Sequence, residues 1–389
     1  MPFSPMNSAN SANSANSANS ANSANSANSA NGFGAYAGMV TSPQLAFALN
    51  SSRARTVSTM DLDDPVKWKA GWGEPGWGWG NATTGNLPTL DQAAHLPRWD
   101  PTTRFHLLYT ELLSGLHFTM EDRFATVSYL APGGLAGPVI SLARPDRDVF
   151  TAQMEWVFGR MSERVDRSPE ILTQVVPQYA YWSSICNLHP DRNAWTIEIT
   201  YAALHFSMLV TQRLKHMLAC PRPIEYSPLL QPMILTPTYG ALPMGHATEA
   251  YMFAKIMEQL LGRDRRDPMI DQLYKLAFRI SENRVIAGLH FPIDALAGYA
   301  LADALADYFV SRARRGQSMV GRAFDGGQFR AYNGVDAPDV TLRDAGASYR
   351  SEATYKTVPS PLLAYMCARA RSEFAYEDDA PPPVTAAGG

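Results

Sequence analysis

Apolar residues recur at three- and four-residue spacing over most of the chain from about Thr103 onward. This spacing places apolar side chains on one face of an α-helix, which must then pack against another element. No run of alternating β-branched residues stands out in this region. We therefore predict an all-α fold, a multi-helix bundle. Its helices are expected at 104–116, 148–165, 193–219, 246–261, 268–288 and 291–310, with proline or glycine near their ends.

The composition is that of a globular chain without a strong overall charge. Of its 389 residues, 46% are hydrophobic and 18% charged, which is enough to bury a substantial core. The formal net charge of -3 excludes the broad basic field that nucleic-acid binding requires. No apolar stretch approaches the roughly 18 to 20 residues that span a bilayer, and no secretory signal is evident. We expect a cytoplasmic protein with neither nucleic-acid nor membrane partners.

The segments that flank the helical region are irregular in composition. The unit SAN repeats eight times from Ser8 to Asn31, and a segment with so little to bury is expected to be disordered. This organisation predicts the following parts: a disordered SAN-repeat tail over 1–36, an irregular Gly-, Pro- and Trp-rich segment packed on the core over 37–102, a helical catalytic domain over 103–316, a C-terminal extension with a short helix over 317–374, and a disordered tail over 375–389.

Two junctions between predicted helices carry cations and an imidazole. In KHMLACPRP, Lys215 ends one helix and Arg222 follows the proline that terminates it. In PMGH, Gly245 and His246 stand where the next helix begins. The first N–H groups of a helix have no intrahelical partner and favour anions, and a glycine allows an anion to approach closely.

A third junction, RVIAGLHFPID, adds Arg284, His290 and Asp294. Asp294 lies four residues after His290, so its carboxylate can accept a hydrogen bond from one ring nitrogen and leave the other free to attack or ligate. Each junction alone is also explained by charges that favour helix ends. Coincidence at three successive junctions is not explained in this way, and together they predict a site for a small oxyanion.

These residues resemble the signature of the vanadium-dependent haloperoxidase and type 2 phosphatidic acid phosphatase (PAP2) superfamily, K-x6-R-P, P-S-G-H and S-R-x5-H-x3-D. The motifs stand here at 215–223, 243–246 and 283–294, and the resemblance covers roughly residues 190 to 310. It implies a haloperoxidase-like fold of paired four-helix bundles around a pocket that holds vanadate as cofactor, with phosphate able to occupy the same place.

The resemblance also implies a role for each residue. His290 would be the axial vanadate ligand, or the nucleophile of a phosphatase, and Asp294 would orient it. His246 would act as acid and base. Lys215 would also polarise hydrogen peroxide during the oxidation of a halide, which then halogenates an organic substrate. The oxygens of the anion would be bound by Lys215, Arg222, Arg284 and the N–H of Gly245.

Within this superfamily, the chain looks more like the soluble bacterial haloperoxidases. It lacks the spans of the membrane phosphatases, and the soluble bacterial acid phosphatases are shorter and usually exported. We expect a vanadate-dependent haloperoxidase that oxidises bromide or iodide in preference to chloride. A soluble acid phosphatase that works through a phosphohistidine, and a non-catalytic anion-binding homologue, are the alternatives. Relatives are often dimers, and a homodimer is one expectation.

Three residues of one loop depart from the pattern. Met244 replaces a serine whose hydroxyl would bind an anion oxygen, and a thioether cannot donate a hydrogen bond. Losing one hydrogen bond to a charged group costs about 1.5 to 3 kcal/mol, or one to two decades in affinity. Tyr239 occupies a position that is histidine or phenylalanine in bromo- and chloroperoxidases of this superfamily, and at Ala241 a polar residue would be unsurprising. We expect these three residues to affect selectivity.

Overall fold

The computed structural model describes Ser51 and residues 89–175, 178–314, 318–329 and 349–374. The chain divides into two compact units, Met1–Thr102 and Thr103–Gly389. In the first unit, the described residues form the 3-10 helix η1 (Ala93–Arg98) and the start of α7 (Pro101–Ser114). The disordered tails predicted over 1–36 and 375–389, and most of the irregular segment predicted over 37–102, lie outside the described residues.

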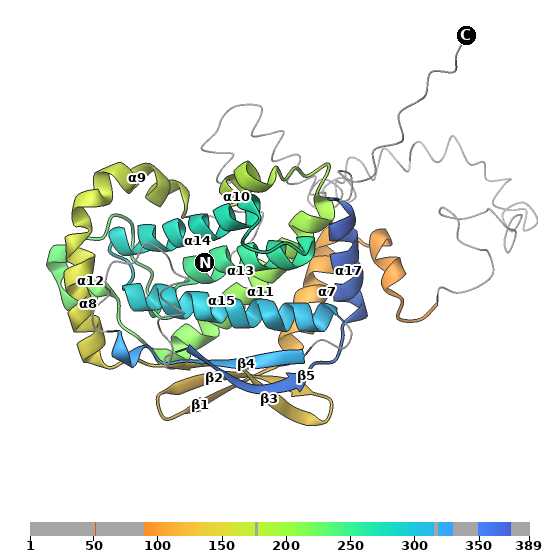
Figure 1. The fold of residues 1–389 in the computed structure, drawn as a ribbon, viewed down its shortest axis with the longest axis horizontal. Coiled ribbons are helices and arrows are strands. Elements are labelled where there is room, and N and C mark those ends of the chain that lie inside the picture. Colours follow the sequence, from red (N-terminus) through yellow and green to blue (C-terminus); the bar gives the residue numbers. More distant parts are fainter. Residues whose placement is uncertain (1–50, 52–88, 176–177, 315–317, 330–348, 375–389) are drawn as a thin grey trace, which may run out of the picture. The chain divides into compact units, whose positions relative to one another are not determined.

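The prediction of an all-α fold is wrong, because the second unit contains a five-stranded mixed sheet. Neighbouring strands are antiparallel, except that β3 and β4 run parallel. Figure 1 shows the sheet as a layer along one side of the helices, beneath α15 (Pro292–Ala313). The strands lie in sequence order: β1 (Leu116–Glu121), β2 (Phe124–Ala131), β3 (Gly134–Ala143), β4 (Ser318–Phe324) and β5 (Tyr349–Lys356).

Several positions of these strands carry small side chains, so their sequences lack the alternation of β-branched residues that predicts a strand. On β4 the inward positions are held by Met319, Gly321 and Ala323. On β3, a Cβ at Gly137 would lie 2.5 Å from the ring of Tyr355, which crosses from β5. The Tyr355 hydroxyl also donates a hydrogen bond to a β3 carbonyl. Aromatic packing over glycine therefore replaces the β-branched pairs that sheets commonly use.

The helices predicted from apolar spacing are present with shifted ends. They are α7, α8 (Arg147–Gly159), α11 (Ala194–Leu218), α13 (Gly245–Leu261), α14 (Pro268–Ile286), α15 and α17 (Pro361–Ser372). The segment predicted as one helix over 148–165 breaks after α8 into η2 (Met161–Glu163) and α9 (Arg164–Thr173). The remaining short helices were not predicted: α10 (Tyr179–Cys186), α12 (Pro223–Tyr226), η3 (Pro228–Leu230) and η4 (Gly326–Gln328). No helix among the described residues combines the length and apolar character needed to cross a membrane.

Four helix termini bring the three sequence junctions together. Helix α11 ends before Ala219, which adopts a left-handed conformation, and α14 ends before Gly288, where φ is +79°. Pro292 begins α15 at a position that needs no backbone donor. At Gly298 of α15, a Cβ would lie 2.7 Å from the carbonyl oxygen of Met244. This glycine therefore allows α15 to pack closely against the start of α13.

Candidate functional site

Lys215 and Arg222 converge on one loop. Lys215 is 2% exposed, and its Nζ donates hydrogen bonds to the carbonyl oxygens of Gly240 (2.9 Å) and Ala241 (2.7 Å). Arg222 is 3% exposed and donates from Nε to the Tyr239 carbonyl (3.0 Å) and from Nη2 to that of Gly240 (3.2 Å). Burial, and then the charge of Arg222, hold the pKa of Lys215 well below its ordinary value.

His290 lies directly beside Arg222. Its Nε2 is 2.9 Å from Nη1 of Arg222, and its Nδ1 is 3.0 Å from Oδ2 of Asp294. A guanidinium can only donate, so Nε2 is the acceptor and Nδ1 carries the proton. Burial, and then the charge of Arg222, hold the pKa of His290 well below its ordinary value. His290 is therefore neutral, with its lone pair on the nitrogen that faces the cations.

Asp294 fixes this arrangement from the first turn of α15. Its Oδ2 also accepts a hydrogen bond from the N–H of Phe291 (2.9 Å), and its carbonyl oxygen accepts one from the N–H of Met244 (2.8 Å). Asp294 is fully buried, and burial raises the pKa of its carboxyl to about 7. The predicted His290–Asp294 hydrogen bond is present, and the same residue joins the start of α15 to the start of α13.

Arg284 is the most deeply buried cation of the set, with no exposed surface. Its Nη2 donates to the Ile171 carbonyl (2.8 Å) and contacts Oε1 of Gln174 (3.4 Å). Its Nε and Nη1 have no hydrogen-bond partner among the described residues. Burial lowers the pKa of Arg284 to about 10, so the group remains charged at neutral pH. Leaving two nitrogens of a buried, charged guanidinium without an acceptor is costly unless an anion accepts from them.

Gly245 and His246 begin α13 next to these groups. No atom lies within 4 Å of the position that a Cβ would take at Gly245, so there is open space beside this residue. Nε2 of His246 is 2.9 Å from the Gln174 carbonyl, which requires the proton on Nε2 and leaves Nδ1 as an acceptor. Burial, and then Arg284, lower the pKa of His246 to about 3.

The three departing residues have separate surroundings. Tyr239 is 48% exposed, and its ring lies 5.5 Å from Nζ of Lys215 and 5.4 Å from the Arg222 guanidinium carbon. Ala241 is buried and acts through the carbonyl that accepts from Lys215. Met244 is buried at the N-cap of α13, without a side-chain cap. The loop therefore contacts Lys215 and Arg222 through hydrogen bonds to its backbone carbonyl oxygens.

Serine in place of Met244 tests the departure. We expect M244S to bind orthovanadate one to two decades more tightly in isothermal titration, because a hydroxyl restores one donor to a charged acceptor. Loss of the buried methionine should cost about 2 to 4 kcal/mol of folding stability, offset by about 1 kcal/mol from a serine N-cap. M244A separates the lost bulk from the added hydroxyl. Equal affinity for the wild type and M244S would show that position 244 does not face the anion.

Two residues near the site were not predicted from the sequence. Gln174, at the end of α9, contacts both Arg284 and His246. Glu249 lies one turn after His246 on α13, and burial raises the pKa of its carboxyl to about 7, against a smaller opposite effect of Lys215. A glutamate four residues into a helix carries no signal that separates it from a solvated one, and Gln174 acts only through tertiary packing.

Glu249 should make folding stability depend on pH. A carboxyl whose pKa rises from 4.5 to about 7 on folding contributes stability below pH 4.5 that is lost as the pH rises through 7. Glu249→Gln removes that dependence, so the variant should gain stability relative to the wild type between about pH 4.5 and 8. Urea unfolding at several pH values measures the difference. A constant difference across that range would contradict the assignment.

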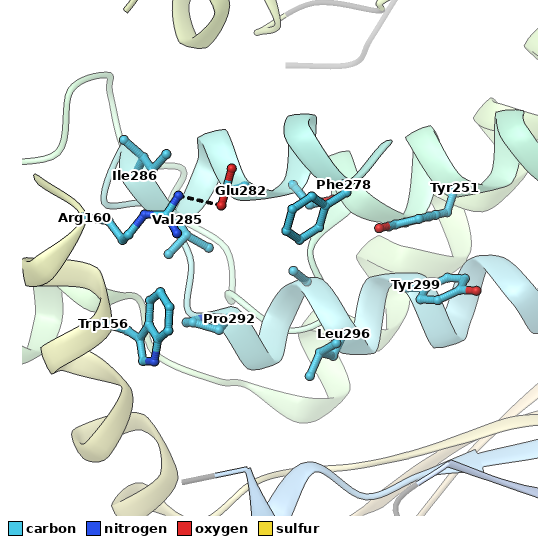
Figure 2. Close-up of a pocket in the computed structure, with 12 residues that line it drawn as sticks. Trp156, Arg160, Tyr251, Phe278, Glu282, Val285, Ile286, Pro292, Leu296 and Tyr299 are labelled. Atoms are coloured by element: carbon cyan, nitrogen blue, oxygen red, sulfur yellow. Dashed lines mark hydrogen bonds and ion pairs between the residues drawn. The ribbon is translucent and has the colours of Figure 1, made fainter. Parts of the chain in front are cut away.

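A separate cavity of about 550 Å³, its open mouth included, lies on another face of α14 and α15 (Figure 2). Its walls are mainly aromatic and aliphatic, and the Arg160–Glu282 ion pair lies at one end. It is lined by none of the residues predicted to form the oxyanion site, the oxyanion cluster of Lys215, Arg222, Gly245, His246, Arg284, His290 and Asp294. Of the residues that line the cavity, Trp156, Phe278, Leu296 and Tyr299 are labelled in the figure.

The electrostatic character of the cluster comes from unbalanced cations. Among the described residues, the side chains of Lys215, Arg222 and Arg284 form no ion pair with a carboxylate. Asp294 is hydrogen-bonded to His290 instead, and Glu225 accepts from the backbone N–H of Arg222. All three cations lower the pKa of His290, so their charges reach one place. Buried cations in such a set are suited to a small, highly charged oxyanion. Comparisons of the sequence with protein-family models and with curated proteins found no match.

Proposed function

We propose that this protein is a vanadate-dependent haloperoxidase that oxidises bromide or iodide with hydrogen peroxide. The observation that carries the proposal is the set of buried cations without carboxylate partners, gathered around a neutral histidine whose unprotonated nitrogen accepts from one of them, Arg222. Bound vanadate would act as a Lewis acid that activates peroxide without a change in its own oxidation state.

The residues present fit such an anion. Arg284 offers two unpartnered nitrogens, Nε and Nη1, and Lys215 has one N–H left after its two carbonyl contacts. Gly245 adds a backbone N–H at a helix start, where the helix dipole favours negative charge. His290 would hold the anion through Nε2, while Asp294 keeps the proton on Nδ1.

His246 supplies a proton acceptor. Its Nδ1 is free to take a proton from incoming peroxide, because its Nε2 proton is held by the Gln174 carbonyl. A bound anion would raise the pKa of His246 from about 3, since it offsets the positive charge of Arg284. The overall reaction balances as H2O2 + Br⁻ + H⁺ giving HOBr + H2O, in which bromide loses two electrons and the peroxide O–O bond breaks.

Burial favours this reaction over ester hydrolysis. Lys215, Arg222 and His290 are between 2% and 5% exposed. Peroxide and halide are small enough for such an enclosed site, whereas a phosphate ester must place an organic leaving group beside the anion. The exposed ring of Tyr239 over two of the cations lies where reactants would enter.

Two assays on the purified full chain test the proposal. One measures bromination of a phenol-type indicator with orthovanadate, peroxide and bromide, and the other measures hydrolysis of an aryl phosphate without vanadate. We expect bromination that requires vanadate, with iodide also accepted and chloride much slower. Phosphate ester turnover without bromination would replace the proposal by the phosphatase, and inactivity in both assays with intact phosphate binding would replace it by a non-catalytic anion-binding protein.

A further inference from the structure

Gln174 connects two members of the proposed site. It is fully buried at the C-cap of α9, where its N–H donates to the Glu170 carbonyl (2.9 Å). Its carbonyl oxygen accepts the hydrogen bond from Nε2 of His246 (2.9 Å). Its side-chain Oε1 is 2.9 Å from Nδ2 of Asn283 and 3.4 Å from Nη2 of Arg284. One residue therefore touches both the acid–base candidate and the most buried cation.

Charged neighbours determine which end of the Gln174 side-chain amide is the oxygen and which is the nitrogen. Arg167 donates to Oδ1 of Asn283 (3.1 Å), so Nδ2 of Asn283 is the end that donates to Glu170 (2.9 Å) and to Gln174. The atom of Gln174 that receives these donors must be its oxygen. The other end is therefore the –NH2 group, and Nε2 of Gln174 has no acceptor among the described residues.

This amide nitrogen adds to a local excess of donors. Nε and Nη1 of the adjacent Arg284 also lack an acceptor, so two buried side chains that contact each other both carry unpartnered N–H groups. Buried donors are rarely left unpaired in native proteins. One acceptor-only ligand with several oxygens, such as phosphate or vanadate, would satisfy them together.

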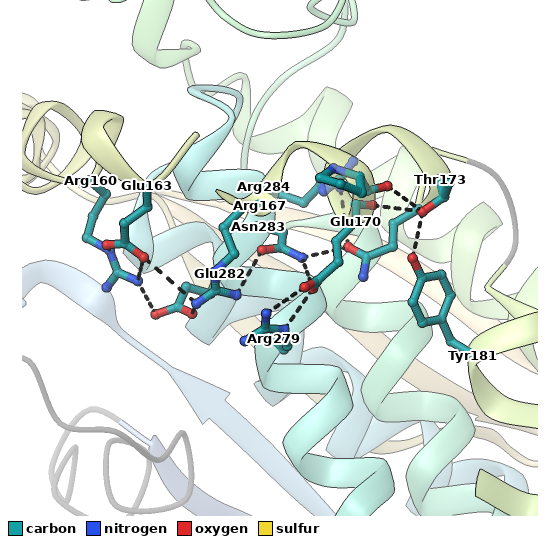
Figure 3. Close-up of polar contacts among 12 residues, drawn as sticks. Arg160, Glu163, Arg167, Glu170, Thr173, Tyr181, Arg279, Glu282, Asn283 and Arg284 are labelled. Atoms are coloured by element: carbon teal, nitrogen blue, oxygen red, sulfur yellow. Dashed lines mark hydrogen bonds and ion pairs between the residues drawn. The ribbon is translucent and has the colours of Figure 1, made fainter. Parts of the chain in front are cut away.

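An ion-pair network holds α9 on α14 and so fixes Gln174 (Figure 3). Glu170 of α9 pairs with Arg279 of α14, and Glu282 of α14 pairs with Arg167 of α9. Glu282 also pairs with Arg160, just after α8. These contacts join the two helices along the turns that precede Gln174 and Arg284, so the amide is fixed relative to the guanidinium.

We propose that Gln174 is a further oxyanion ligand, which donates a hydrogen bond from Nε2 to the bound anion and positions His246 through its carbonyl oxygen. This inference rests on the proposed function, because it requires the anion site. Gln174 would add a neutral donor to the cationic set. This donor would compensate for Met244, whose side chain cannot donate a hydrogen bond. The resemblance to known families does not predict this donor, because α9 lies outside the matched motifs.

Phosphate titration of two variants tests the proposal. Gln174→Met keeps the length of the side chain and removes its polar atoms, so inorganic phosphate should bind about 10- to 100-fold more weakly in isothermal titration. Gln174→Glu keeps an acceptor for Asn283 and Arg284 but turns the donor into a carboxylate, so the loss should exceed 100-fold. The glutamate variant also preserves the contacts to α14, which keeps the test valid if the methionine variant folds poorly.

A double-mutant cycle separates a ligand from a residue that only positions Arg284. In the Arg284→Met background, Gln174→Met should still weaken phosphate binding about tenfold or more. No further loss in that background would overturn the proposal. Gln153→Met is the control: Gln153 is a buried glutamine of α8 with both ends paired, to Phe329 (2.7 Å) and Ile293 (3.0 Å). It should lose stability with phosphate affinity within about threefold. Absence of phosphate and vanadate binding by the wild type would instead refute the oxyanion site itself.

Discussion

Replacing His290 with alanine is expected to reduce vanadate-dependent bromination to background, a loss of at least about 1000-fold in kcat. Nε2 of His290 is an imidazole lone pair held among the cations, where it accepts from Arg222, whereas Lys215 and Arg222 can only donate and Oδ2 of Asp294 accepts from Nδ1 of the ring. A phosphatase would lose its nucleophile by the same change. The indicator assay with vanadate, peroxide and bromide measures the loss.

Two further variants control this experiment. His290→Gln can still donate to Asp294 and accept from Arg222, so it should fold like the wild type and bind phosphate while remaining inactive. His205→Gln changes a half-buried histidine of α11 whose ring lies 5.1 Å from Phe105 and 5.3 Å from Tyr109, and it should keep full activity. More than a tenth of wild-type activity in either His290 variant would mean that another group binds the cofactor.

The gathering of the site residues could be predicted because it depends on local helix-end chemistry. Gly288 and Pro292 fix where α14 ends and α15 begins, and so they determine where His290 stands. The hydrogen bond from His290 to Asp294 follows from a four-residue separation across that turn. Such short-range relations are written in a few consecutive residues, so the sequence carries them directly.

The sheet and the contacts of Gln174 could not be predicted because they depend on long-range packing. Strand β3 pairs in parallel with β4, nearly two hundred residues later, and the buried positions of β4 include glycine and alanine, which carry no strand signal. Gln174 reaches Arg284 only because ion pairs such as Glu170–Arg279 set the packing of α9 on α14. Neither relation has a local pattern that a period or a motif could reveal.

Replacing Arg284 with methionine is expected to separate anion binding from folding stability. Nε and Nη1 of Arg284 are buried donors without an acceptor, so phosphate affinity should fall at least about 100-fold, at about 1.5 to 3 kcal/mol for each charge-assisted hydrogen bond. Without phosphate, the methionine variant should be about as stable as the wild type, because an apolar side chain of similar length avoids the cost of a buried, unpaired charge. Thermal unfolding with and without phosphate measures both effects.

A second buried arginine supplies the matched control for Arg284→Met. Arg312 lies about 27 Å farther along α15 than Asp294, is 7% exposed, and contacts Glu111 (3.4 Å) and the Tyr308 hydroxyl (2.9 Å). Arg312→Met should therefore lower the melting temperature and leave the phosphate-induced rise intact, because it breaks a paired charge away from the site. In Arg284→Met that rise should vanish. Equal phosphate-induced rises in both variants would mean that Arg284 is a structural cation, and that the anion binds without it.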